Sequence, residues 1–186
     1  MKRVFFDSSV LVAATASLEG ASALILGWCK NRKLAGYMSA DVLGEAKKNV
    51  AFKLGASYLS RFEDIVEKSH LVLIPEPAVE LISVCERVIH PKDAPILAAA
   101  VQSRADIILT FDRRHFLTKE AMVFAAPKKI MTPGDFIFRS RGGGDGERSR
   151  RGGGQKVGDR GRGRLPGLGG MGGERSRREQ GEGLPA

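Results

Sequence analysis

The sequence predicts an α/β fold in three layers, α/β/α, with a mostly parallel central sheet between helices. Three observations lead to this prediction. Short apolar runs rich in Val, Ile and Phe alternate along the chain with longer stretches whose apolar residues recur at helical spacing. The short runs hold few polar residues, which is typical of parallel strands covered by helices on both faces. All of these patterns lie before Arg139, so we expect one folded domain over residues 1–138.

The first half of this domain begins with a strand over residues 2–6, which is rich in β-favouring residues and ends at Asp7. Ser8 and Ser9 can cap a helix that runs to about residue 17. Apolar residues at spacings of three and four predict further helices, and short β-favouring runs predict strands. In chain order we expect a helix over 21–33, a brief strand at 37–38, a helix capped by Ser39 that runs to residue 54, and a helix over 58–68.

The second half contains a continuous apolar run, Leu71–Ile74, which Pro75 ends. This pattern predicts a parallel strand that is buried on both faces. The remaining elements are predicted in the same way. They are helices over 78–88 and 91–104, a strand over 106–110, a last short strand within 122–130 and a closing helical turn over 133–138.

The composition changes at Arg139. Of the 23 glycines, 17 follow this residue, and Phe138 is the last aromatic residue. Residues 1–138 hold 18 basic and 15 acidic side chains, whereas residues 139–186 hold 12 and 6, so most of the net charge of +9 belongs to the C-terminal segment. This segment has too few apolar residues to offset the entropy cost of ordering, and we expect a disordered tail.

The tail repeats Arg and Gly, with RGGG at 141–144 and again at 151–154. Such a segment attracts RNA by neutralising phosphate charge. It can equally be a solubilising extension whose sequence is not selected, because the aromatic residues that stack on bases are missing. The composition leaves both interpretations open.

Three further features concern the environment of the protein. Cys29 and Cys85 lie in apolar helical stretches and are expected to be buried free thiols. No apolar run approaches the roughly 18 residues of a membrane span, and the charged N-terminus followed by a short β-like run is unlike a signal peptide. We therefore expect a soluble, cytoplasmic protein without a membrane partner.

Four acids are expected at one edge of the sheet. In an open α/β sheet, ligands bind beyond the carboxyl ends of the strands. Asp7 ends the first strand and Asp112 follows the strand over 106–110, while Glu45 lies in the early turns of one helix and Asp93 begins another. Taken singly, each acid can be a helix cap, a first-turn acid, a solvated helix residue or a turn former. Their common position beside apolar segments favours one crevice instead.

Four carboxylates in one crevice would repel each other and raise each other's pKa values. Divalent cations relieve this repulsion, and oxygen ligands without His or Cys select Mg²⁺ or Mn²⁺. Such ions lower the pKa of a bound water and stabilise charge on a reacting phosphodiester. The pattern thus indicates metal-assisted hydrolysis.

Three segments resemble the PIN-domain family of nucleases, which includes the toxins of VapBC-type toxin–antitoxin pairs. They are VFFDSSVLVAA (4–14), SADVLGEAKKNV (39–50) and PKDAPILAAAVQSRADIILTFDRRHF (91–116), and the resemblance extends over residues 1–138. It implies a parallel sheet with the first and fourth strands at its centre, and an acidic pocket that binds Mg²⁺ or Mn²⁺. In this resemblance the metal-binding, catalytic acids are Asp7, Glu45, Asp93 and Asp112.

The resemblance also gives roles to neighbouring residues. Thr110 matches a recurrent hydroxyl position that orients a water or a carboxylate, and Ser8 is a weaker candidate for the same support. Some family members carry a further acid where this chain has His115, which can contact a phosphate or be an ordinary turn histidine. Arg113 and Arg114 can bind RNA or be solvated.

Other polar residues carry weaker signals. Lys47, Lys48, Asn49 and Lys53 form a basic flank on the helix of Glu45, which can guide a nucleic-acid backbone or be the solvated face of that helix. His70 and His90 suggest no metal site.

The functional hypothesis is a Mg²⁺- or Mn²⁺-dependent endoribonuclease that prefers single-stranded RNA. As a toxin it would pair with a small antitoxin and commonly form a homodimer, and a housekeeping RNA nuclease fits nearly as well. The alternative is a non-catalytic RNA-binding or scaffold protein that acts through the Arg/Gly-rich tail over residues 139–186.

Overall fold

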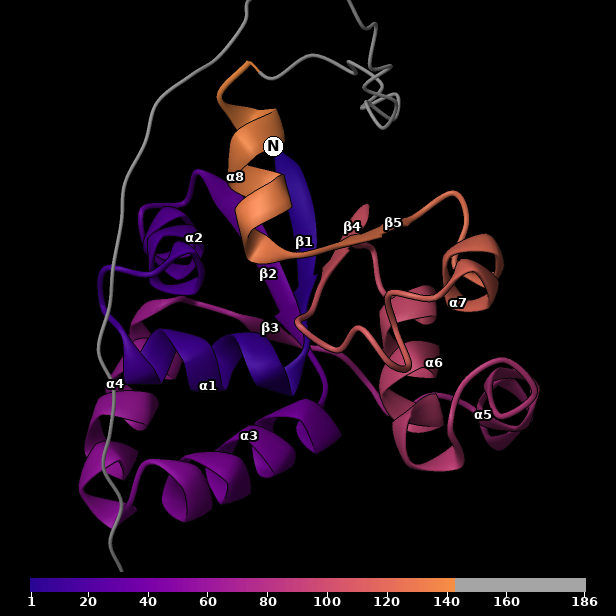
Figure 1. The fold of residues 1–186 in the computed structure, drawn as a ribbon, viewed down its shortest axis with the longest axis horizontal. Helices are drawn as coiled ribbons and strands as arrows, with labels where there is room; N and C mark the ends of the chain where they lie inside the picture. Colours follow the sequence, from indigo (N-terminus) through magenta and orange to yellow (C-terminus); the bar gives the residue numbers. More distant parts are fainter. Residues whose placement is uncertain (143–186) are drawn as a thin grey trace, which may run out of the picture. The chain divides into compact units, whose positions relative to one another are not determined.

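The computed structural model describes residues 1–142 of the 186-residue chain, and these residues contain a five-stranded, all-parallel sheet (Figure 1). The strands are ordered β3-β2-β1-β4-β5 across the sheet. Their bounds are β1 Lys2–Phe6, β2 Leu34–Met38, β3 Val72–Leu73, β4 Ile107–Leu109 and β5 Lys129–Met131. The predicted α/β class with a parallel sheet is therefore confirmed.

Helices flank this sheet (Figure 1). Their bounds are α1 Ser8–Ala16, α2 Ala21–Lys30, α3 Ala40–Lys53, α4 Leu59–Lys68, α5 Val79–Cys85, α6 Ala94–Gln102, α7 Lys119–Phe124 and α8 Pro133–Ser140, with short 3-10 turns at Ala56–Tyr58 and Pro91–Asp93. Helix α1 packs against α2, α3 and α4, whereas α5 packs against α6. Two groups of helices thus pack around the central strands.

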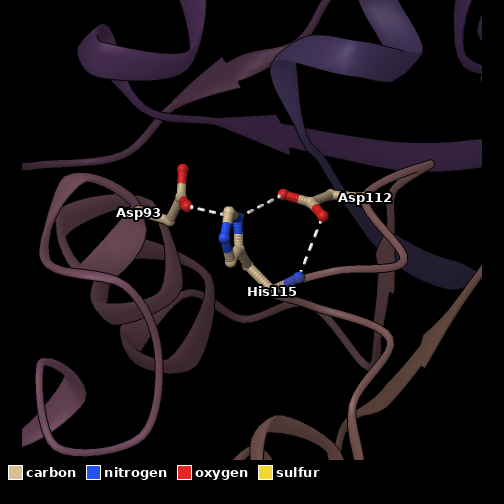
Figure 2. A group of neighbouring side chains, drawn as sticks. All are labelled: Asp93, Asp112 and His115. Atoms are coloured by element: carbon tan, nitrogen blue, oxygen red, sulfur yellow. Dashed lines mark hydrogen bonds and ion pairs between the residues drawn. The ribbon is translucent and has the colours of Figure 1, made fainter.

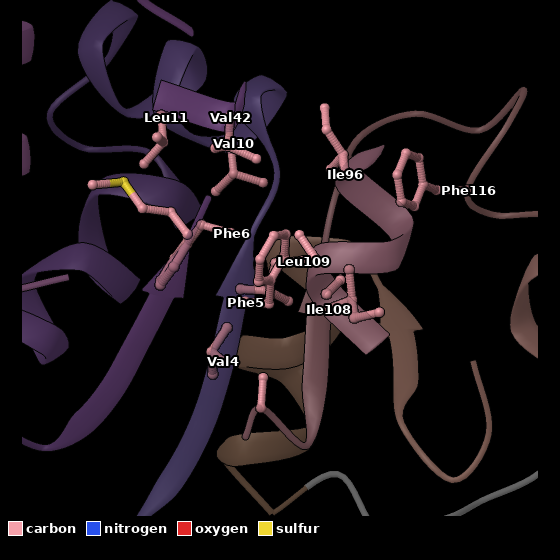
Figure 3. Close-up of a cluster of buried hydrophobic side chains, with 14 of the residues drawn as sticks. Val4, Phe5, Phe6, Val10, Leu11, Val42, Ile96, Ile108, Leu109 and Phe116 are labelled. Atoms are coloured by element: carbon pink, nitrogen blue, oxygen red, sulfur yellow. The ribbon is translucent and has the colours of Figure 1, made fainter. Parts of the chain in front are cut away.

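The centre of the sheet is strand β1, with β2 on one side and β4 on the other. Val4, Phe5 and Phe6 are completely buried. Successive side chains of a strand point to opposite faces, so both faces of β1 must be covered. Ile108 and Leu109 of β4 are buried beside them (Figure 3). The central position of the first and fourth strands agrees with the family resemblance.

Strand β3 differs from the prediction. Val72 and Leu73 are 51% and 54% exposed, so the expected burial on both faces is wrong. The strand lies at the edge of the sheet and pairs only with β2. Of the apolar run that suggested a buried strand, only Ile74 is buried. An apolar run cannot by itself distinguish an edge strand from a central one.

The segment before β5 was also predicted incorrectly in part. Residues 119–124 form α7, and the strand is confined to Lys129–Met131. The Thr118 side chain caps this helix by accepting a hydrogen bond from the backbone N–H of Ala121. That cap, followed by an acid in the first turn, is the local signal that the strand prediction overlooked.

The C-terminal boundary is only partly described. Helix α8 continues the predicted closing turn to Ser140, past the expected domain end at residue 138. From residue 143 onward, the predicted disordered tail and its proposed role in RNA binding lie outside the described residues.

Cys29 and Cys85 are buried free thiols, as expected, and burial raises their pKa values to about 12 and about 11. Between residues 1 and 142, no single helix is long and apolar enough to cross a membrane. The bent pair of α1 and α2 meets the length and composition requirement only when the two are taken together.

Gly36 in β2 provides a test of the packing around the sheet. A Cβ atom there would meet the Leu71 side chain and would lie 3.0 Å from Phe6 Cε2 and 3.1 Å from Cys29 Sγ. We expect Gly36→Ala to destabilise the domain by about 1–3 kcal/mol because overpacking displaces its neighbours. Gly27→Ala is the control, since its Cβ meets nothing within 4 Å in a helix. A Gly36→Ala melting temperature at or above that of Gly27→Ala would contradict this account.

Candidate active site

The four predicted acids meet at the carboxyl end of the sheet. Asp7 follows β1, Asp112 follows β4, Glu45 lies in α3 and Asp93 directly precedes α6. All four line one cavity of about 330 Å³. The chain thus brings together acids separated by up to 105 positions in sequence.

Asp7 is the most buried of the four, with 4% of its surface exposed. Its backbone N–H donates to the Leu109 carbonyl at 3.0 Å and extends the pairing of β1 with β4. The Thr110 hydroxyl, on the adjacent strand end, donates to Asp7 Oδ2 at 2.8 Å. Although Asp7 occupies the N-cap position of α1, its side chain makes no capping hydrogen bond. The carboxylate instead accepts hydrogen bonds from side-chain hydroxyl groups.

Ser9 contributes a contact that sequence reasoning assigned only to helix capping. Its hydroxyl donates to Asp7 Oδ2 at 2.6 Å and accepts from the backbone N–H of Phe111 at 3.0 Å. The side chain thus connects the start of α1 with the loop after β4. The Asp-Ser-Ser sequence was the only available signal, and it did not distinguish this role from a cap.

Glu45 is held by two partners. The Ser8 hydroxyl donates to Glu45 Oε2 at 2.8 Å and lies 3.5 Å from Asp7 Oδ1. The ammonium group of Lys92 lies 3.3 Å from Glu45 Oε1. The hydrogen bond to Glu45 raises the pKa of Lys92, which therefore stays charged. Ser8 joins two of the acids, and Lys92 partly compensates their charge.

His115 lies between the other two acids (Figure 2). Its Nδ1 atom is 3.0 Å from Oδ2 of Asp93 and 3.0 Å from Oδ2 of Asp112, so a proton on this nitrogen can be shared between them. Possible ligand atoms of the three residues all lie within 4.8 Å of one another. His115 thus adds an imidazole nitrogen to the possible ligand atoms, whereas the sequence prediction named oxygen ligands only.

Asp112 is fixed further by the backbone. Its Oδ1 atom accepts hydrogen bonds from the backbone N–H groups of Arg114 at 2.8 Å and His115 at 2.9 Å. The Thr110 hydroxyl accepts from the backbone N–H of Asp112 at 2.9 Å. Thr110 therefore links Asp7 and Asp112 directly.

The electrostatics differ among the acids. Burial raises the pKa of Asp7, against the opposing effect of hydrogen bonds from Ser9 and Thr110. Burial likewise raises the pKa of Asp93, against the attraction of His115. Burial acts in the same direction on Asp112, but hydrogen bonds from the backbone and the ring of His115, with that from Arg114, outweigh it and lower its pKa. The cavity thus holds two carboxylates whose ionisation is disfavoured without a cation.

Some of the weaker candidate residues from the sequence line the cavity and others do not. Arg113 and Arg114 are exposed and do not line the cavity. His90 does line it, and its ring centroid lies 5.4 Å from that of His115, a contact that no sequence pattern indicated. Asn49 and Lys53 of the basic flank also line the cavity. Lys47 instead forms an ion pair with Glu63 at 2.7 Å.

A cavity of this composition is suited to a divalent cation. Several carboxylate oxygens face one space, and burial works against the charge of two of them. Carboxylate ligands suit Mg²⁺ and Mn²⁺, and an imidazole nitrogen is more readily accepted by transition-metal ions. The fold and the site together define an α/β protein with an acidic ligand cavity at the end of a parallel sheet.

The sequence itself identifies the family. The PIN domain matches residues 3–114, which is more than half of the chain. This protein therefore belongs to the PIN-domain family, whose members are generally metal-dependent nucleases. No curated protein sequence matches the chain.

Two solved structures share the fold. One is VapBC2 from Rickettsia felis bound to a DNA fragment from their promoter, with 14% identity over 62% of this chain and 91% of that one, and a TM-score of 0.50. The other is PAE2754 from Pyrobaculum aerophilum, with 17% identity over 74% of this chain and 88% of that one, and a TM-score of 0.51. At these identities the similarity concerns the fold.

The burial of Asp7 predicts that the stability of the folded protein depends on pH. Because its pKa is raised in the folded state, the folded protein binds the proton more tightly than the unfolded one, and stability is lost as the pH rises through the folded pKa. We expect Asp7→Asn to raise the melting temperature by about 2–4 °C at pH 7.5 in EDTA. The gain should shrink as the pH is lowered towards 4.5. A gain that is the same at both pH values would exclude desolvation as its cause.

Proposed function

We propose that this protein is a Mg²⁺- or Mn²⁺-dependent endoribonuclease that hydrolyses phosphodiester bonds in single-stranded RNA. One observation carries the proposal: Asp7, Glu45, Asp93 and Asp112 line the same cavity. Membership of the PIN-domain family supports the class of reaction. The RNA substrate and the identity of the metal are part of the proposal.

Asp7, Asp93 and Asp112 would hold the metal directly, and Glu45 would hold it or position the attacking water. A divalent ion bound there would lower the pKa of that water and compensate charge on the phosphate. His115 is a further possible ligand because its nitrogen lies among the same oxygen atoms.

The supporting residues orient these acids. Thr110 and Ser9 both donate to Oδ2 of Asp7, so its Oδ1 atom keeps acceptor capacity for a ligand. Ser8 holds Glu45 through a short hydrogen bond. Fixed carboxylates of this kind lower the cost of reorganisation during the reaction. We assign Thr110 and Ser8 this positioning role, and Arg113 and Arg114, which are exposed, a weaker role in contacting RNA beyond the cavity.

As a biological role, we propose the toxin of a toxin–antitoxin pair, acting in the cytoplasm. The family supports this role, and so does the similarity of fold to the VapBC2 structure. An antitoxin would then bind the protein and block the acidic cavity, and a homodimer would be its assembled form. Growth arrest on expression, relieved by co-expression of a neighbouring small reading frame, would support this role.

Cleavage of RNA tests the reaction. The full-length wild type should cleave single-stranded RNA in Mn²⁺ or Mg²⁺, and Asp7→Asn combined with Asp93→Asn should lower the rate by about a hundredfold or more, because two charged ligands are lost. The matched control is Asp64→Asn with Glu120→Gln, two exposed acids outside the cavity, which should retain the wild-type rate. Equal cleavage by the two double variants would reject the proposed site.

Metal binding can be tested without activity. A ligand that binds only the folded state stabilises it by about 2.7 kcal/mol at a hundredfold excess over its Kd. We therefore expect Mn²⁺ to raise the melting temperature of the wild type and of the Asp64→Asn, Glu120→Gln control by several degrees. The Asp7→Asn, Asp93→Asn variant should lose most of this shift. An equal shift in all three proteins would place the metal elsewhere.

A further inference from the structure

A second cavity adjoins the acidic one. It has a volume of about 490 Å³ and is lined by residues of α3 and of the segment that begins α6. Glu45, Asn49 and Lys92 line both cavities. The second cavity is therefore adjacent to the proposed catalytic cavity, and the ion pair between Lys92 and Glu45 belongs to the lining of both.

The lining of the second cavity combines charge with apolar surface. Lys48 projects from α3, and the Lys92 side chain is 70% exposed. Pro95, at the start of α6, is half-buried and supplies apolar surface, whereas Ile96 beside it is buried. Asp41, in the first turn of α3, is the acid that belongs to this cavity alone.

The cavity follows the axis of α3. Residues three and four positions apart share one face of a helix, so Asp41, Gly44, Lys48 and their neighbours form a single stripe. From Asp41 to Asn49 this stripe is about 12 Å long at 1.5 Å per residue. Asp41 lies at one end of this stripe and Glu45 in its middle, and Lys48 and Asn49 lie at the other end. The charges of Lys48 and Lys92 balance those of Asp41 and Glu45, so a phosphate would be attracted only beside the two lysines.

We infer that the second cavity binds the nucleotide next to the scissile phosphate of single-stranded RNA, an inference that rests on the proposed function. Lys48 and Lys92 would contact the phosphates that flank the cleaved bond. The apolar surface of Pro95 would receive the ribose and base. Only an unpaired strand can place a base in a cavity, because a duplex keeps its bases stacked and presents phosphates.

Gly44 is a position where a larger side chain can be introduced to fill the second cavity. It lines the second cavity, and a Cβ atom added there meets nothing within 4 Å. A larger side chain at this position of α3 should project into the cavity. Gly27 in α2 is the matched control, because it is also helical, its Cβ also meets nothing, and it lines a separate cavity that shares no lining residue with these two.

The experiment measures binding of a fluorescein-labelled, mixed-sequence single-stranded RNA of 12 nucleotides to the full-length protein by anisotropy. Asp7→Asn and Asp93→Asn are present in every protein so that the RNA stays intact. Gly44→Phe should weaken binding about tenfold, within the range for the loss of one base contact. Gly27→Phe should change the affinity less than twofold. Melting temperatures of both variants verify that each is folded.

The salt dependence provides a second measurement. The slope of log K against log salt should fall in magnitude by about 0.7 when one phosphate contact with a single strand is removed. We expect this decrease for Lys48→Gln. The control is Lys30→Gln, which removes a lysine that lines the same cavity as Gly27, and its slope should equal that of the parent.

The outcomes separate this inference from the proposed function. Equal affinities of the Gly44→Phe and Gly27→Phe proteins, including the case in which residues 139–186 provide all the binding, would overturn the inference. RNA cleavage by the wild type would still support the nuclease. If the wild type cleaves no RNA while the Gly44 and Gly27 variants differ tenfold, the nuclease proposal fails and the binding site stands.

Discussion

The Asp7 carboxylate is buried where β1 and β4 end, and two hydroxyl groups donate to one of its oxygens. This arrangement requires the two strands to be adjacent and in register, because Thr110 follows β4 and Ser9 lies in the first turn of the helix after β1. Complete burial of Phe5, Phe6, Ile108 and Leu109 enforces that register. The geometry of the acidic cavity therefore depends directly on the packing of the central strands.

The acids of the cavity have partners within the chain, an ammonium group and an imidazole ring. Lys92 lies beside Glu45, and the His115 ring lies between Asp93 and Asp112. Such internal partners lower the repulsion that a cluster of carboxylates would otherwise create. A metal ion bound to Glu45, Asp93 or Asp112 would accordingly compete with Lys92 or His115 for the carboxylate oxygens. Asp7, whose neighbours are neutral hydroxyl groups, has no cation of this kind among the described contacts.

Sequence reasoning predicted the parts of this structure that local pattern controls. Apolar runs located β1 and β4, and the strand ends located Asp7 and Asp112. It failed where the outcome depends on neighbours distant in sequence: the exposure of Val72 follows from the edge position of β3. The contact of His90 with His115 and the link from Ser9 to Phe111 likewise join segments that no spacing rule relates. The sequence therefore predicted which acids belong to the site, whereas the side-chain contacts around them became known only from the fold.

The order of the acids along the chain has a consequence for synthesis on the ribosome. Asp7 and Glu45 belong to the first third of the described residues, whereas Asp112 and His115 belong to the last third. Strand β4 can pair with β1 only after the residues between them have been synthesised. A nascent chain cannot assemble the cavity until residue 115 has left the exit tunnel. The acidic cavity therefore depends on late contacts between distant parts of the chain, and no shorter segment that ends before residue 115 contains all of its acids and His115.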